Sequence, residues 1–128
     1  MKKIIIIGGG DFAKKIIRLI GRIGDYEIIG YTDIEDRGTL FGVDYLGNDE
    51  NVPNLFEKYN CANVAIGIGG NISLADAKRR IISRLVENNI NFPSLISPNA
   101  FIEEDVIIGE GVVVFDNVFV DYGVRIGD

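Results

Sequence analysis

A six-residue period in the last part of the chain restricts the fold more than any other feature of the sequence. If Ile96 is position i of a hexad, the i and i+4 positions of the hexads that follow are all apolar. A strand with one buried face would also place apolar residues at i+2. The residues found at i+2 are Pro98, Glu104, Glu110, Asp116 and Tyr122. The period is therefore six and not two.

This period predicts a parallel β-helix. Each hexad would form one short side of a triangular coil with its i residue pointing inward, and three hexads would complete one coil. Gly109, Gly111, Gly123 and Gly127 stand next to the expected corners, where a tight turn favours a residue without a Cβ atom. We therefore predict that residues 96–128 form just under two coils. Strands of a sandwich with a coincidental spacing are the alternative.

The hexads resemble those of hexapeptide-repeat proteins. This resemblance implies a left-handed coil, an exception to the usual right-handed crossover, and association into homotrimers through the β-helix. A β-helix of under two coils leaves a strand edge exposed, and repeat folds generally need at least three units and a cap. We therefore expect the chain to be the N-terminal portion of a longer protein.

Residues 1–95 alternate short apolar runs with segments of helical period. The run "KIIIIG" (3–8) is typical of a parallel strand buried on both faces. Apolar residues at three- and four-residue spacing from Phe12 to Ile23 predict a helix that Gly24 ends. Further strands are expected at 27–33, 41–47, 63–70 and 90–96, the last as an edge strand, and a short helix at 52–59. Ser73 is expected to open another helix, whose apolar face carries Ala77, Ile81, Ile82, Leu85 and Val86. The alternation predicts an α/β, Rossmann-like parallel sheet with flanking helices, followed by the β-helix.

Composition and net charge limit the kinds of partner that the chain is expected to bind. Hydrophobic residues make up 47% of the chain, enough for a core, and the net charge of −6 disfavours a nucleic-acid partner. The first apolar run ends after four isoleucines, too short for a signal peptide or a membrane span, so no membrane partner is expected. The single Cys61 provides no disulfide and no thiolate metal site, which fits a reducing cytoplasm and predicts no bound metal.

A glycine-rich turn follows the first strand. "GGGDFA" (8–13) fits the G-x-G-x-x-A pattern, in which glycines and the amides of a helix N-terminus accommodate a phosphate. Asp33 ends the second strand 23 residues beyond Gly10, near where an acidic residue binds a ribose hydroxyl. Alternatives are a glycine turn without a ligand, helix capping by Asp11 and a turn role for Asp33.

A second glycine cluster, "IGIGGN" (66–71), follows the third predicted strand. It would lie at the same carboxyl edge of the sheet, where ligands of open α/β folds bind. Asn71 is a candidate hydrogen-bonding group of this loop, with a simple tight turn as the alternative. Two such loops on one edge favour a nucleotide site.

The order of these motifs resembles the sugar-nucleotide acetyltransferases of bacterial surface-polysaccharide and glycoprotein synthesis. That family includes sialic acid O-acetyltransferases and bacillosamine-type N-acetyltransferases. The resemblance rests on "IIIGGGDFAKK" (5–15), "IIGYTD" (28–33), "VAIGIGGN" (64–71), "FPSLISPNAFI" (92–102) and the later hexads. It implies acyl transfer from acetyl-CoA to a nucleotide-linked sugar, for which a UDP-sugar is expected.

The resemblance also implies the roles of individual residues. Acetyl-CoA, the co-substrate of the complete enzyme, would bind between the β-helices of neighbouring subunits and is not expected on this chain alone. The substrate-binding residues carried over are Gly8, Gly9, Gly10, Asp11, Phe12, Asp33, Ile34, Gly69, Gly70 and Asn71.

The general base of such enzymes is a histidine. This chain has none, so the catalytic residue is expected beyond residue 128. Asp116, Asp121 and Tyr122 are interpreted as solvent-facing or corner residues rather than substitutes for it. The family usually has histidine where Asp11 and Ser97 stand, and it often has a second acidic residue where Ile34 stands.

Two other functions stay open at this point. G-x-G-x-x-A with Asp33 also fits an NAD-dependent oxidoreductase of Rossmann type. A non-enzymatic nucleotide-binding and trimerisation module would equally need a glycine loop and coils.

Overall fold

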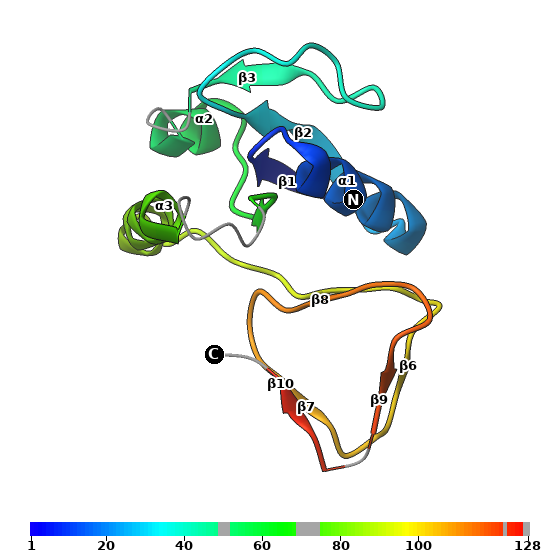
Figure 1. Cartoon of the computed structure of the whole chain (residues 1–128). Helices are drawn as coiled ribbons and strands as arrows, with labels where there is room; N and C mark the ends of the chain where they lie inside the picture. Colours follow the sequence, from blue (N-terminus) through cyan, green and yellow to red (C-terminus); the bar gives the residue numbers. More distant parts are fainter. Residues whose placement is uncertain (49–51, 69–74, 122, 127–128) are drawn as a thin grey trace.

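A strand of isoleucines organises the N-terminal part of the structure (Figure 1). β1 (Lys2–Ile7) pairs in parallel with β2 (Tyr26–Thr32) and β4 (Val64–Ile66), and β3 (Tyr45–Gly47) lies beyond β2. The sheet order is β3-β2-β1-β4, so the predicted parallel α/β sheet is confirmed. This computed structural model describes residues 1–48, 52–68, 75–121 and 123–126.

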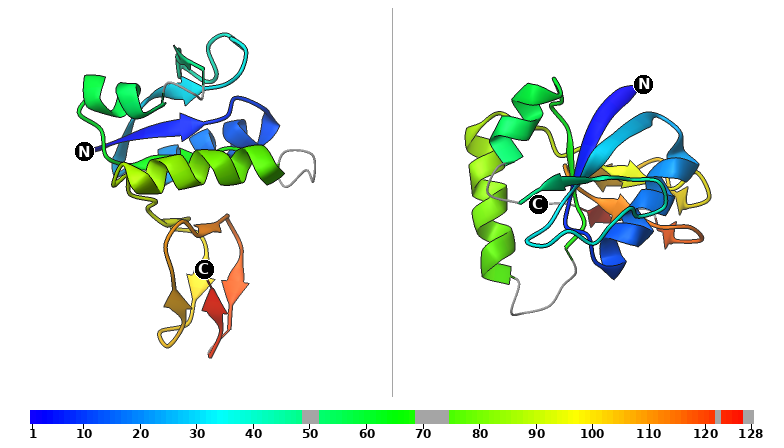
Figure 2. Two further views of the ribbon diagram at one scale, coloured as in Figure 1. Left: turned by 90° about the vertical axis from the view of Figure 1, so that its left-hand side faces the viewer. Right: turned by 90° about the horizontal axis from the view of Figure 1, so that it is seen from above.

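Both faces of β1 are covered by helices. Ile4 and Ile6 pack toward α1 (Asp11–Ile23), while Ile5 and Ile7 face the opposite cluster, which includes residues of α2 (Val52–Lys58) and α3 (Ala75–Glu87). Figure 2 shows α1 on one side of the sheet and α2 with α3 on the other. All four isoleucines are fully buried, and each contributes about 1.5–3 kcal/mol to stability. Burial on both faces explains why this strand is apolar at every position.

The ends of α1 show why the chain turns where it does. Gly24 adopts a left-handed conformation with φ of 82° and donates its N–H to the carbonyl of Ile20 at 3.1 Å, which confirms the predicted end of the helix. At the other end the capping residue is Gly10, so the interpretation of Asp11 as the cap is wrong. Asp11 is instead the first helical residue, where a carboxylate stabilises the positive end of the helix dipole.

The hexads form stacked triangular coils, as Figure 1 shows. Partners in the short parallel pairs are eighteen residues apart, for example Leu95 with Val113 and Phe101 with Phe119, so three hexads make one coil. Val114 and Val120 at position i point into the coil and are buried. The strands are β5 (Leu95–Ile96), β6 (Phe101–Ile102), β7 (Ile107–Ile108), β8 (Val113–Val114), β9 (Phe119–Val120) and β10 (Arg125–Ile126). The predicted β-helix coils are confirmed.

One predicted strand is wrong. Residues 90–96 were expected to form an edge strand of the α/β sheet, but Asn91 makes only an isolated bridge with Asn63, and Leu95 and Ile96 pair with β8. The physical reason is that these two apolar residues already follow the hexad period, so their burial is satisfied in the first coil. The predicted apolar face of α3 is also narrower than expected, since Leu85 is buried while Val86 is exposed.

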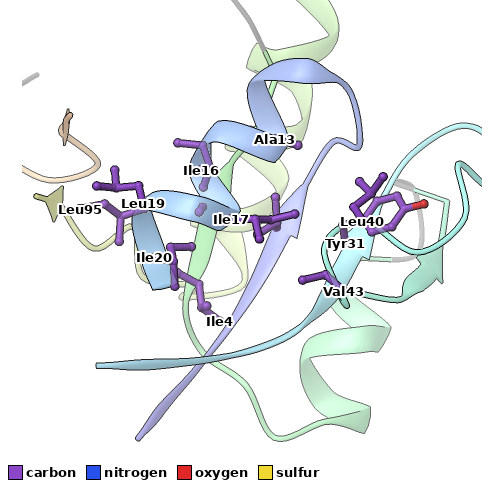
Figure 3. Packing of buried hydrophobic residues seen from close by; sticks show 12 residues of the cluster. Ile4, Ala13, Ile16, Ile17, Leu19, Ile20, Tyr31, Leu40, Val43 and Leu95 are labelled. Carbon is purple, nitrogen blue, oxygen red and sulfur yellow. The ribbon is translucent and has the colours of Figure 1, made fainter. Parts of the chain in front are cut away.

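The first coil is fastened to α1. Leu95 packs in the same core cluster as Leu19, and the two side chains lie together in Figure 3. Beside them, the buried Ser97 hydroxyl donates to the carboxylate of Asp116, which also forms an ion pair with Arg22 of α1 at 3.0 Å. Asp116 lies in the turn between β8 and β9, as the corner interpretation expects, and in addition it joins two parts of the chain.

This junction predicts a pH-dependent stability. The hydrogen bond from Ser97 and the charge of Arg22 hold the pKa of Asp116 below its usual range. A carboxyl with a lowered pKa in the folded state stabilises the fold above its unfolded pKa, and that stabilisation is lost as the pH falls through the folded pKa. Asp116→Asn should lower the melting temperature at pH 7, and the difference from wild type should shrink from pH 5 to pH 3.

Thermal unfolding followed by circular dichroism across this pH range measures the effect. The matched control is Asp25→Asn, which removes an exposed carboxylate at the turn after α1. A difference that stays constant with pH for Asp116→Asn would contradict the assigned role.

Candidate functional site

The loop between β1 and α1 lies at the carboxyl edge of the sheet, next to the end of β2 (Figure 2). Gly8 donates its N–H to the carbonyl of Thr32 at 2.7 Å, which continues the β1–β2 pairing into the loop. The carboxyl edge is where open α/β sheets bind ligands. The sequence therefore places its glycines at a position suited to a site.

The three glycines of the loop are needed for different reasons. Gly8 has a φ of 104°, which disfavours other residues. A Cβ atom on Gly9 would lie 2.5 Å from Cε2 of Tyr31, so a larger residue does not fit. A Cβ atom on Gly10 would meet nothing within 4 Å. Protein packing thus explains Gly8 and Gly9, whereas Gly10 leaves open space at the start of α1.

Asp33 holds this loop from the end of β2. Its Oδ2 accepts hydrogen bonds from the N–H of Gly9 at 2.9 Å and from Nε of Arg37 at 2.8 Å. Its Oδ1 accepts the N–H of Ile34 at 2.6 Å. With only 8% of its surface exposed, Asp33 has both oxygens engaged by the protein. In this structure it acts as a positioning residue for the loop.

Tyr31 forms the floor beneath Gly9. Its ring is fully buried, and its hydroxyl donates to the carbonyl of Gly38 at 2.7 Å and accepts the N–H of Arg37 at 3.0 Å. Burial raises the pKa of Tyr31, so the phenol stays protonated near neutral pH. This residue therefore shapes both the glycine loop and the segment after Asp33.

Arg37 is the residue of this site that sequence reasoning missed. Besides Asp33, its guanidinium contacts Glu35 at 3.2 Å, so it bridges two carboxylates at the mouth of the site. The only signal in the sequence was an opposite charge four residues after Asp33. A four-residue spacing brings two side chains together only on a helix, and residues 33–37 are not helical. Here the contact between Asp33 and Arg37 depends on a turn that is held by the hydroxyl of Tyr31.

The structure brings together four of the residues expected to bind substrate, namely Gly8, Gly9, Gly10 and Asp33. Ile34 is exposed beside them. Phe12 turns away and packs edge-on against Phe115, with ring centroids 6.2 Å apart. Gly69, Gly70 and Asn71 lie outside the described residues.

Asp11 does not obstruct the start of α1. Its side chain is 99% exposed and its nearest cation is Lys14, at 3.9 Å. The carboxylate therefore extends into water, and the backbone at Gly10 keeps its open side. The first N–H groups of a helix lack partners within the helix and attract anions, so this end of α1 suits a phosphate.

Two other kinds of site receive no support. Among the described residues, no group of three or more His, Cys, Asp or Glu side chains could hold a metal ion. Within the same part of the chain, no helix has the length and apolar character needed to cross a membrane.

A Rossmann-like sheet with a glycine loop at its carboxyl edge runs directly into the coils of a hexapeptide-repeat β-helix. The chain belongs to the family of the PglD N-terminal domain, whose model matches residues 3–85. A search of curated proteins gives no significant match.

Solved structures extend this likeness to the coils. The chain superimposes over its whole length on a perosamine N-acetyltransferase variant from Caulobacter crescentus, solved with CoA and GDP-perosamine (TM-score 0.86, 24% identity). It also matches the acetyltransferase domain of PglB from Neisseria gonorrhoeae FA1090, solved with acetyl coenzyme A, over 99% of its length (TM-score 0.83, 26% identity). The chain spans 58% and 59% of these two proteins. The resemblance inferred from the sequence is confirmed for family and fold.

Gly9 and Gly10 differ in the space available for a side chain, and this difference predicts different effects on stability. Gly9→Ala should lower the free energy of unfolding by about 1–3 kcal/mol, because the new methyl group overlaps the buried Tyr31 ring. Gly10→Ser is the matched control and should leave stability unchanged or raise it by a few tenths of a kcal/mol, since serine caps a helix slightly better than glycine. Urea unfolding of both variants measures the difference, and equal effects would refute this account of the loop.

Proposed function

We propose that this chain is the sugar-nucleotide-binding part of an acetyl-CoA-dependent sugar N- or O-acetyltransferase of bacterial surface glycan synthesis. The observation that carries the proposal is the open backbone at Gly10, at the N-terminus of α1, in a chain of the PglD N-terminal domain family. Protein packing gives no reason for glycine there, whereas a diphosphate needs close approach to the backbone.

The proposed binding mode follows from the geometry of the loop. The diphosphate would lie against Gly10 and the first turn of α1, and Gly8 and Gly9 would hold the loop in place. Asp33 would position the loop through Gly9, and Ile34 would present an exposed apolar surface to the base or ribose. Asp11 would border the phosphate end, whereas Phe12 packs against Phe115 and would not contact the ligand. From the sequence pattern, residues 69–71 would close the opposite side.

The proposed substrate is a UDP-sugar, and the complete enzyme would use acetyl-CoA as co-substrate and assemble as a homotrimer through the β-helix. The Caulobacter protein was solved with CoA and GDP-perosamine and the Neisseria domain with acetyl coenzyme A, which supports a nucleotide-linked sugar and an acetyl donor. We place the protein in the cytoplasm. Its single cysteine supports this, because Cys61 is free and a lone cysteine provides no disulfide within the chain.

The chemistry would be attack of a sugar amine or hydroxyl on the carbonyl carbon of the acetyl thioester, which breaks the C–S bond and releases CoA as its thiol. A general base would accept the proton of the attacking group. This chain contains no histidine, and we assign it no catalytic residue. Its proposed contribution is to bind and orient the nucleotide-linked sugar, which lowers the entropic part of the barrier.

The geometry disfavours an NAD-dependent oxidoreductase. In that function Asp33 would accept hydrogen bonds from a ribose, but its oxygens already accept them from Gly9, Ile34 and Arg37. The likeness to a Rex-family repressor solved with β-NADH, at 18% identity and a TM-score of 0.55, shows a shared fold only.

Calorimetric titration with UDP-, GDP- and dTDP-linked amino sugars tests the proposal. We expect saturable binding of the UDP-sugar, weaker binding of the others and no saturable binding of NADH. Failure of every sugar nucleotide to bind would overturn the proposed function.

A substitution at Gly10 tests the proposed position of the phosphates. Gly10→Asp should fold as well as the wild type, because aspartate is a favourable helix cap, yet it should weaken sugar-nucleotide binding by at least about tenfold through repulsion of the phosphates. Gly10→Ser is the neutral control and should weaken binding less. Equal affinity for Gly10→Asp and wild type would place the nucleotide elsewhere.

A further inference from the structure

A basic groove lies along α1, bordered by Phe41 from the segment between β2 and β3 and by Phe115 from the coil. Four cations of the helix, Lys14, Lys15, Arg18 and Arg22, line this groove, which has a volume of about 520 Å³. Arg22 is paired with Asp116, and Lys14 lies 3.9 Å from Asp11. Lys15 and Arg18 form no ion pair among the described residues. In a chain with a net charge of −6, this groove is a local excess of positive charge.

Three phenylalanines line the groove, and one of them, Phe41, has an unfavourable backbone conformation. Phe41 and Gly42 occupy the centre of a tight turn closed by reciprocal hydrogen bonds between Leu40 and Val43 at 2.9 and 2.8 Å. Both central residues have positive φ, 47° and 83°, which is the type I′ geometry that favours Asn-Gly. A phenylalanine in this conformation is strained.

Burial of the Phe41 side chain does not offset this backbone strain. The Phe41 side chain is 55% exposed, and the guanidinium of Arg18 lies 4.1 Å from the centre of its ring. An exposed aromatic residue kept in an unfavourable conformation suggests a contact outside the chain, since aromatic and arginine side chains dominate the energetics of interfaces.

An acidic corner on the β-helix has the opposite character. Glu103, Glu104 and Asp105 border a shallow hollow of about 490 Å³ together with Phe101 and Ile102. Asp105 accepts the N–H of Gly123 at 3.0 Å, whereas Glu103 and Glu104 form no ion pair in the described part of the chain.

Beside this corner, two phenylalanines form an exposed stack. Phe101 and Phe119 are 57% and 60% exposed, and their rings are 5.4 Å apart and nearly parallel. The acidic corner and the basic groove therefore each combine unpaired charges with exposed aromatic rings, and the charges are of opposite sign.

The two surfaces cannot meet within one copy of the chain. Figure 1 shows α1 above the side of the coil that contains β8, whereas the corner between β6 and β7 lies at the far end of the triangle.

We propose that the basic groove of one copy receives the acidic corner of a second copy. Lys15 and Arg18 would pair with Glu103 and Glu104, and Phe41 would pack near the Phe101–Phe119 stack. Because the contact joins two different surfaces, it is heterologous and closes into a ring of copies when the rotation between neighbours permits. The proposal does not depend on the sugar-nucleotide site.

Charge reversal in the groove is the first test, with mass measured by light scattering after size exclusion. The wild-type chain should associate, and association should weaken with added salt, as expected for exposed charges. Lys15→Glu with Arg18→Glu should raise the dissociation constant by at least about a hundredfold, because like charges would then face each other. Lys2→Glu, at the exposed start of β1, is the matched control and should behave like the wild type.

The reciprocal variant makes the test specific to this pairing. Glu103→Lys with Glu104→Lys should also dissociate, while the control Glu57→Lys on α2 should not. Mixing the groove-reversed chain with the corner-reversed chain should restore association, because each then offers the surface that the other needs. Restoration would support the contact, and two monomers that stay separate after mixing would overturn it.

Phe41→Asn separates folding from association. Asparagine suits the first central position of a type I′ turn, so the variant should melt at the same or a higher temperature than the wild type. It should nevertheless associate at least about tenfold more weakly, because it lacks the aromatic ring.

Three further results would overturn the proposal. They are a monomeric wild-type chain at millimolar concentration, unchanged association of the groove-reversed chain, and calorimetric binding of pyrophosphate or ADP to wild type that is lost on groove reversal while association persists. The last result would identify the groove as a site for a small anion.

Discussion

Burial of β1 on both faces is the constraint on which the rest of the structure depends. Ile4 and Ile6 require α1 on one side, and Ile5 and Ile7 require α2 and α3 on the other. This arrangement places the end of β1, and with it the three glycines, between two helical layers at the carboxyl edge of the sheet. The location of the candidate site is therefore a consequence of core packing, because apolar contacts alone determine where β1 ends.

Within the site, structural and binding roles are divided among neighbouring residues. Gly8 and Gly9 are required by the fold, through backbone conformation and through contact with Tyr31. Asp33, which resembles a ligand-binding residue in the sequence, is committed to the protein by three hydrogen bonds. A motif match thus identifies the neighbourhood of a site correctly, but only the three-dimensional contacts show which members stay available to a ligand.

Features with a local period could be predicted from the sequence, whereas features made by distant contacts could not. The isoleucine strand, the helix ending at Gly24 and the hexad coils each have a repeating pattern or a stop signal within a few residues. The pair Arg22–Asp116 joins residues 94 positions apart, and no local pattern announces it. Residues 90–96 show the same limit, because two competing partners, the sheet and the first coil, both suit an apolar segment and only tertiary packing chooses between them. The contact between Asp33 and Arg37 could not be predicted for a related reason, since the buried Tyr31 determines the shape of the turn that joins them.

The two ends of α1 serve different parts of the molecule. The first turn carries the open backbone at Gly10, and the last turn carries Arg22, which is fastened to the coil through Asp116 and Ser97. One continuous helix, α1, therefore connects the loop to the β-helix. A molecule held at Gly10 would keep a set distance and direction from the coils, so its far end would reach the same place at every encounter.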